Sequence, residues 1–221
     1  MSALLNNADS VRAGFAGIMP EKRGATMRIR EERQINPVAE DVAARSLAFG
    51  EALSAAILAW SESDGGAVVE NMGFPMAYAL NPAPGRWVPT SAIRQQQFPL
   101  LPKWGENRTF AMPNGTSCGL PPPPAYSEDP ASNFYREARE VYDVTRSLTP
   151  DQTAIARFWS DDPMLSPTPP GHWMFIANSI LEDEKAGLDK TAEVMMRLGV
   201  AMADAFIGCW NAKYQYDLVR P

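Results

Sequence analysis

The sequence has few of the side chains that bind metals or form disulfide bonds: its 221 residues include two cysteines and one histidine. Cys118 and Cys209 are too few for a disulfide framework, and they do not form the Cys-x2-Cys pattern of a zinc site. Cys209 falls in an apolar helical stretch, where we expect it to be a small buried hydrophobic side chain. The sequence therefore argues against a disulfide-rich scaffold and against zinc, and it leaves the redox compartment open.

Basic charge is also scarce, because 20 lysines and arginines face 26 aspartates and glutamates, which gives a net charge of −6. A nucleic-acid-binding surface would show a basic stripe, so nucleic acid is not an expected partner. An acidic protein is still compatible with a local cationic pocket that binds a small anion.

Signal sequences and long apolar runs are missing as well. The first ten residues, MSALLNNADS, have neither the basic start nor the continuous apolar run of a signal peptide. The strongest apolar stretch, 194–210, is interrupted by Arg197 and Asp204, so we expect no membrane span. The compartment stays open, and a secreted or periplasmic location remains compatible with a longer precursor.

What the chain does have is apolar residues at three- and four-residue spacings, the pattern of amphipathic helices. No convincing strand-like alternation accompanies it, so we predict an all-α fold, a helical bundle that is incomplete at its C-terminus. The predicted helices cover residues 38–60, 131–146, 150–160, 172–185 and 189–220, with a weaker candidate at 7–19. Thr149 and Gln152 are expected to form a capping box around Pro150, and Asp189 to cap the last helix.

Composition divides this one incomplete domain into an N-terminal helical part (1–62), a proline-rich part (63–132) and a second helical part (133–221). Twelve of the 20 prolines fall in the middle part. It also carries many large apolar side chains, which favours an ordered, extended segment packed on the helical bundle over a flexible linker.

Lys213 and Arg220 lie seven residues apart, which on a helix is nearly two turns and places them on one side, about 10 Å apart. Asp217 lies between them and is expected to orient either cation. Pro221 is expected to end the helix, because the residue before a proline disfavours helical angles. The arginine fork and the compact lysine charge together suit a tetrahedral oxyanion. The alternative is a solvated helix face.

The pattern Lys-x6-Arg-Pro resembles the first of three motifs of the type 2 phosphatidic acid phosphatase superfamily, which includes bacterial acid phosphatases and vanadium-dependent haloperoxidases. Further stretches are similar to the bacterial haloperoxidase-like branch. These are 200–205, 210–217, 168–173, 148–150 with 158–159, 84–90 and 101–105. The resemblance covers most of residues 40–221 and implies a helical fold.

The resemblance implies that Lys213 and Arg220 contact oxygens of bound vanadate, or of phosphate in a phosphatase. With vanadate, hydrogen peroxide would oxidise a halide or act on a small organic substrate, and neither haem nor zinc is required. The family's later serine-glycine-histidine motif and its final arginine and histidine have no counterpart before Pro221. The resemblance therefore implies the N-terminal portion of such an enzyme. We predict that this chain alone is inactive and self-associates through the exposed face of its last helix.

Two alternatives remain open. The same cations would serve a phosphatase that hydrolyses phosphate monoesters through a phosphohistidine, and a non-enzymatic helical scaffold is the other. His172, the only histidine, cannot be both nucleophile and acid, so we expect it to be structural, with its ring hydrogen-bonded and Trp173 packed. The acidic runs 161–162 and 182–184 are predicted to be solvated faces, not metal sites.

Overall fold

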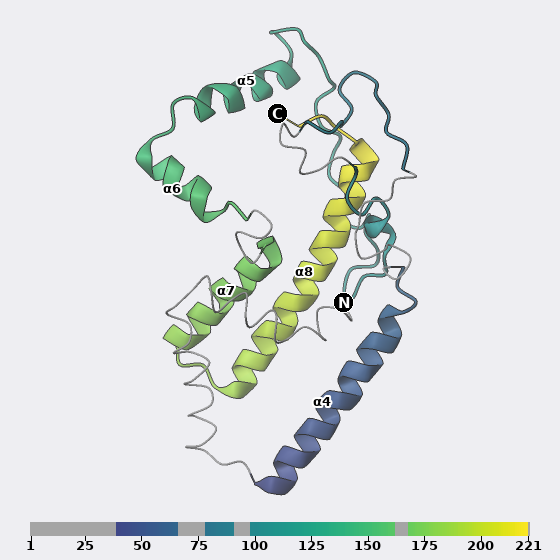
Figure 1. Ribbon diagram of the computed structural model, residues 1–221, viewed down its shortest axis with the longest axis vertical. Coiled ribbons are helices and arrows are strands. Elements are labelled where there is room, and N and C mark those ends of the chain that lie inside the picture. Colours follow the sequence, from purple (N-terminus) through teal and green to yellow (C-terminus); the bar gives the residue numbers. More distant parts are fainter. Residues whose placement is uncertain (1–38, 66–77, 91–97, 162–167, 221) are drawn as a thin grey trace. The chain divides into compact units, whose positions relative to one another are not determined.

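The computed structural model describes residues 39–65, 78–90, 98–161 and 168–220, and in these residues the protein is helical (Figure 1). The elements are α4 (Glu40–Ser61), the short 3-10 helix η3 (Trp104–Glu106), α5 (Asn133–Thr145), α6 (Pro150–Phe158), α7 (Thr168–Asp183) and α8 (Leu188–Tyr216). The only strand-like pairing among the described residues is a single antiparallel bridge between Arg86 and Leu218. The all-α prediction is confirmed.

The chain divides into two compact units, residues 1–63 and 64–221. The described part of the first unit is α4, which was predicted over 38–60 and begins at Glu40. Its start at Pro37 and the weaker helix at 7–19 lie outside the described residues. The predicted boundaries of the helical and proline-rich parts stay a prediction.

Helix α4 has an unexpected property for a segment in which we predicted no membrane span. Within the part of the chain that the structure describes, it is the one helix whose length and composition would allow it to cross a bilayer. The strongest apolar stretch of the sequence was 194–210, whereas residues 44–61 combine many alanines with two charges, Arg45 and Glu51. Core helices of soluble proteins and signal sequences meet the same criterion, so this property assigns no location.

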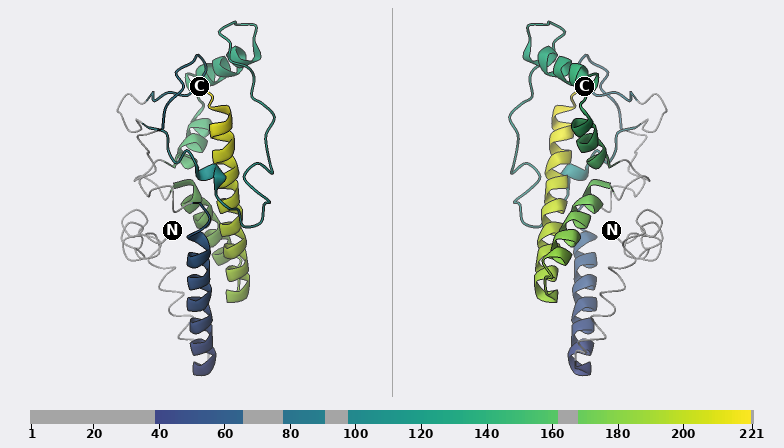
Figure 2. Two further views of the ribbon diagram at one scale, coloured as in Figure 1. Left: turned by 90° about the vertical axis from the view of Figure 1, so that its right-hand side faces the viewer. Right: turned by 90° about the vertical axis from the view of Figure 1, so that its left-hand side faces the viewer.

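The second unit is built on α8, a helix of 29 residues. Figures 1 and 2 show α7 beside α8 and running in the opposite direction, and both α7 and η3 pack against α8. The N-cap of α8 is Gly187 and has no side-chain cap bond, so the prediction that Asp189 caps this helix is wrong. Asp189 lies in the first helical turn, where a carboxylate still interacts favourably with the helix dipole.

The predicted bounds of α5 and α6 lie within two residues of the observed ones. Ser132 caps α5 by accepting a bond from the Tyr135 N–H. The predicted capping box of α6 is confirmed, with Thr149 accepting from the Gln152 N–H and Gln152 accepting in return from the Thr149 N–H. Helix α7 begins at Thr168, four residues before the predicted start, so His172 lies inside the helix.

Residues 98–132 of the proline-rich region are held against α8 by an aspartate. Asp204 is only 4% exposed, and its carboxylate accepts bonds from the backbone N–H groups of Phe110 (2.7 Å), Ala111 (2.8 Å) and Met112 (2.8 Å). Burial alone would raise the pKa of Asp204, but the three donors outweigh it and the pKa is lowered. Successive amides that converge on one carboxylate fix the loop to the helix.

Two glycines allow the same region to approach α8 closely. A Cβ atom at Gly105 would collide with the backbone nitrogen of Asn211, and one at Gly115 would lie 2.5 Å from the Gly105 carbonyl oxygen. Backbone therefore packs directly on backbone beside the last turns of α8. Larger side chains at these positions would push η3 off the helix.

Candidate functional site

Helix α8 ends at Tyr216, earlier than predicted. Asp217 takes a left-handed conformation (φ 46°, ψ 46°), and its N–H closes the helix on the Lys213 carbonyl oxygen. Lys213 is therefore on the last turn of the helix, whereas Arg220 lies on the segment that follows. The prediction that both cations share one helix face is wrong, because the helix stops at Asp217 and not before Pro221.

The segment after α8 is held by a turn that comes some 130 residues earlier in the chain. The Trp87 N–H donates to the Asp217 carbonyl oxygen (3.1 Å), and the Val219 N–H donates to the Gly85 carbonyl oxygen (2.8 Å). The Arg86 guanidinium adds a bond of 2.8 Å to the Tyr216 carbonyl oxygen. These three bonds set the direction in which the chain leaves α8, and so the position of Arg220.

Gly85 is the residue that permits this turn. Its φ of +80° lies in the left-handed region, and a Cβ atom there would meet the Tyr126 ring at 2.5 Å. The stretch 84–90 belongs to those that resemble the haloperoxidase-like branch, but no role of residues 85–87 could be predicted from the sequence. The pair Pro84-Gly85 marks a turn, although nothing local shows that the turn bonds to the end of α8.

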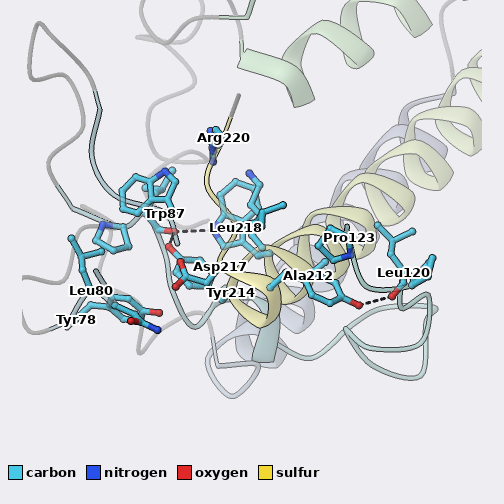
Figure 3. A pocket seen from close by; sticks show the side chains of 17 residues that line it. Tyr78, Leu80, Trp87, Leu120, Pro123, Ala212, Tyr214, Asp217, Leu218 and Arg220 are labelled. Atoms are coloured by element: carbon cyan, nitrogen blue, oxygen red, sulfur yellow. Dashed lines mark hydrogen bonds between the residues drawn. The ribbon is translucent and has the colours of Figure 1, made fainter. Parts of the chain in front are cut away.

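Lys213 and Arg220 line one cavity of about 440 Å³ at the end of α8 (Figure 3). Asp217 and Asn81 line it too, and the remaining wall is aromatic, aliphatic and proline side chains. Figure 3 places Tyr78, Leu80 and Trp87 on one side of the helix end, and Leu120 and Pro123 on the other. The two predicted site residues thus line the same concave surface. That both bind one anion stays a prediction.

The surroundings of Lys213 make its charge less well solvated. Its amine lies 3.9 Å from the centroid of the Trp210 ring, a cation–π contact. Burial lowers the pKa of Lys213, and the nearby positive charge of Arg220 lowers it further. The two cations of the cavity therefore lie close enough for the charge of Arg220 to act on Lys213.

Asp217 does not orient either cation as predicted: among the described residues no ion pair joins it to Lys213 or Arg220. Its negative charge instead raises the pKa values of two tyrosines that line the cavity. Burial raises the pKa of Tyr214 to about 12, and the charge of Asp217 contributes to that rise. Tyr78 has a raised pKa from burial and from Asp217 as well.

The last turns of α8 are fixed by one carbonyl group. The Tyr214 hydroxyl and the Trp210 indole N–H both donate to the Leu100 carbonyl oxygen, at 2.6 and 2.9 Å. The Tyr216 hydroxyl donates to the Leu120 carbonyl oxygen at 2.5 Å. These bonds tie both walls of the cavity to the helix that carries Lys213.

His172 lies apart from this cavity, of which it is not a lining residue. Its Nδ1 atom is 3.1 Å from both carboxylate oxygens of Asp161, and the residue is 8% exposed, with its ring packed against Phe158 and Trp159. The expected structural role agrees with this packing, and the Trp173 ring lies 5.6 Å from that of Trp159. Asp161 corrects the prediction of a solvated acidic run, because its side chain is only 10% exposed.

Other predicted candidates are placed on the surface. Residues 182–184 are exposed, as expected for a solvated face. Cys209 is exposed, so the expectation of a small buried side chain is wrong. In the described residues no group of three or more His, Cys, Asp or Glu side chains is arranged to hold a metal cation.

Neither a protein-family model nor a curated protein sequence matches the chain. It is similar to the solved structure of a bacterial vanadium-dependent iodoperoxidase, with a TM-score of 0.71 and 32% sequence identity. The match covers 92% of this chain and 50% of that one, so the chain spans half the length of the iodoperoxidase. A haloperoxidase-like fold is therefore shown, whereas membership of the wider phosphatase superfamily stays a prediction.

Proposed function

We propose that the chain is the N-terminal portion of a vanadium-haloperoxidase-like enzyme that oxidises halide with hydrogen peroxide at a vanadate held by Lys213 and Arg220. One observation carries the proposal: these two cations line the same cavity, in a fold similar to that of a vanadium-dependent iodoperoxidase. The half-length match supports the expectation that further groups of the site come from outside these 221 residues.

The residues of the cavity fit a tetrahedral oxyanion. Lysine supplies a compact charge with three donors, and arginine a planar fork that binds two oxygens at once. The partly desolvated amine of Lys213 interacts more strongly with an anion than a lysine in water would. Bound vanadate would supply a Lewis-acidic centre that activates hydrogen peroxide, with no change in the oxidation state of the metal.

Lys213 and Arg220 are held in position by different parts of the fold. Lys213 projects from a helix whose last turns are pinned through Trp210 and Tyr214 to Leu100, so its position is set by a rigid element. Arg220 lies on the segment held by residues 85–87. Positioning of this kind allows fixed donors to bind an oxyanion without reorganising at the moment of reaction.

A phosphatase would use the same two cations, so they do not choose between the chemistries. The iodoperoxidase named by the structural match favours the first. Both chemistries require a histidine at the site, and the one histidine of this chain is paired with Asp161 and is not a lining residue of the cavity, so it does not distinguish them either. A non-enzymatic scaffold is the third alternative, and for the 221 residues alone we predict no turnover.

The experiment compares two assays on the complete protein, that is, this chain with the remainder of its reading frame. We expect halide-dependent oxidation of a phenol by hydrogen peroxide when vanadate is added, and loss of that activity when vanadate is removed by a chelator. Hydrolysis of p-nitrophenyl phosphate without halide oxidation would reject the proposal in favour of the phosphatase.

Arg86→Gln is expected to weaken oxyanion binding by about fivefold while the fold is retained. The exposed Arg86 bond to the Tyr216 carbonyl oxygen is worth about 1 kcal/mol, and its loss loosens the segment that carries Arg220. Calorimetric titration with phosphate checks this, with Arg139→Gln on the exposed face of α5 as the control. An unchanged affinity in Arg86→Gln would show that residues 85–87 do not position the site.

Asp217→Asn is expected to strengthen oxyanion binding by about fivefold, because it removes a negative charge that lines the cavity. Asparagine tolerates the left-handed conformation that ends α8, so the helix end is preserved. The same titration measures the change, and Asp143→Asn, in an exposed ion pair on α5, is the control. Equal or weaker binding would mean that the anion does not approach Asp217.

A further inference from the structure

The turn of residues 83–86 holds the segment that carries Arg220, so the position of the turn matters for the site. The Arg86 N–H donates to the Ala83 carbonyl oxygen (3.0 Å), with Pro84 and Gly85 between them, and the φ of Gly85 is +80°. This is the arrangement of a type II turn. The bond fixes the shape of the turn but not its place in the unit, which depends on the contacts that the turn makes with the rest of the chain.

Tyr126 contacts this turn from the proline-rich region. A Cβ atom at Gly85 would lie 2.5 Å from both the Cβ and the Cγ atoms of Tyr126. The tyrosine side chain therefore packs directly on the Gly85 backbone, in the space that a side chain at this position would take. The Tyr126 ring also makes an edge-to-face contact with Phe134 on the first turn of α5, with centroids 5.1 Å apart. The ring thus joins the turn to α5.

The hydroxyl group of Tyr126 has a different partner. It donates to the Glu128 carboxylate (2.7 Å), two residues along the chain, and this bond is exposed. An exposed bond between near neighbours contributes little to the position of a distant segment. The ring, and not the hydroxyl, is therefore the part of Tyr126 that bears on the turn.

Gly85 is the link between Tyr126 and Arg220. Its carbonyl oxygen accepts the Val219 N–H at 2.8 Å, and Val219 directly precedes Arg220 on the segment that leaves α8 (Figure 3). A shift of Gly85 would therefore lengthen or break a bond next to the arginine. Lys213 lies on α8, whose last turns are held by other bonds. Tyr126 itself is not a lining residue of the cavity.

We infer that Tyr126 is a positioning residue for Arg220: its ring supports Gly85, and so sets how well the guanidinium meets an oxyanion that Tyr126 does not touch. The inference rests on the proposed oxyanion site at Lys213 and Arg220. It adds a residue outside the cavity on which the site depends, and it requires that this residue act on one of the two cations only.

The test titrates the 221-residue chain with phosphate by calorimetry. We expect Tyr126→Leu, which removes the ring but keeps an apolar side chain at a position that is 38% exposed, to weaken binding by about fivefold, the effect of one aromatic contact. Tyr126→Phe, which removes only the exposed hydroxyl bond, should bind like the unchanged protein. Tyr142→Leu, which removes an exposed tyrosine of α5, is the matched control and should leave binding unaltered.

A double-mutant cycle shows whether the effect acts through Arg220. In the Arg220→Gln background, Tyr126→Leu should cause no further loss of affinity. In the Lys213→Gln background, it should still cause a loss of about fivefold. A general loosening of the unit would instead weaken binding in both backgrounds.

The outcomes separate this inference from the proposed oxyanion site. An unchanged affinity in Tyr126→Leu, an equal loss in both backgrounds, or a loss in Tyr126→Phe as large as that in Tyr126→Leu overturns the positioning role while the oxyanion site stands. Failure of the unchanged chain to bind phosphate overturns the oxyanion site and the positioning role with it. If Tyr126→Leu does not fold, Tyr126→Met takes its place in the cycle, because its flexible side chain adapts to the same contact, with an expected loss of about twofold to threefold.

Discussion

An Asp204→Asn variant is expected to lose about 3 kcal/mol of unfolding free energy in the unit of residues 64–221. The two carboxylate oxygens of Asp204 accept three backbone N–H bonds from residues 110–112. Asparagine offers one acceptor oxygen and turns an NH₂ group toward the remaining donors, so buried N–H groups lose their partners. The change keeps the shape of the side chain and therefore isolates the hydrogen bonds.

Denaturant unfolding followed by tryptophan fluorescence measures this loss, because Trp104 and Trp210 lie on η3 and α8. The control is Asp189→Asn, an exposed carboxylate at the other end of α8, which should cost less than about 1 kcal/mol. A loss in Asp204→Asn no larger than in the control would mean that the proline-rich segment is held by other contacts.

The pH dependence of stability gives a second readout of the same carboxylate. The pKa of Asp204 is lowered in the folded protein, so the unfolded chain binds the proton more tightly. The stabilisation by Asp204 is thus fully present above its ordinary pKa of 3.8 and is lost as the pH falls through the lowered value. The Asp204→Asn variant should lack this component of the acid transition.

Lys213→Gln and Arg220→Gln are each expected to weaken binding of phosphate or vanadate by about tenfold to a hundredfold. Hydrogen bonds to charged groups contribute about 1.5 to 3 kcal/mol, which corresponds to this range. Glutamine keeps the length and polarity of both side chains while removing the charge. Calorimetric titration measures the loss, and Lys190→Gln, an exposed cation in the first part of α8, serves as the control.

The lowered pKa of Lys213 also predicts how anion affinity changes with pH. Its amine loses its proton at a lower pH than a lysine with the ordinary pKa of 10.5, so anion affinity should begin to fall at a correspondingly lower pH. In Lys213→Gln this component of the pH dependence should be absent. If both charge-neutralised variants bound as tightly as Lys190→Gln, the anion would be held elsewhere.

The sequence predicted features whose cause is local. The capping box of α6 needs only Thr149, Pro150 and Gln152, and the structure confirms it. The all-α fold follows from the three- and four-residue spacing of apolar side chains. Lys213 and Arg220 were found from a motif, and both line one cavity.

The features that sequence reasoning missed depend on contacts between distant residues. Helix α8 ends at Tyr216 and not before Pro221, and the segment that follows it is held by bonds to residues 85–87. Asp204 appeared to be an interruption of an apolar stretch, because its partners are backbone N–H groups more than ninety residues away, which no residue type reveals. Asp161 was assigned to solvent, since its pairing with His172 depends on the contact of Phe158 and Trp159 with His172, which residue types alone do not reveal.

The position of a bound oxyanion tests the central claim most directly. Crystals of the chain soaked in tungstate, a heavy tetrahedral oxyanion, would locate it by anomalous scattering. Our account predicts one site in the cavity at the end of α8, with oxygens within hydrogen-bond distance of both the Lys213 amine and the Arg220 guanidinium. An anion bound by only one of them, or bound only outside this cavity, would contradict it.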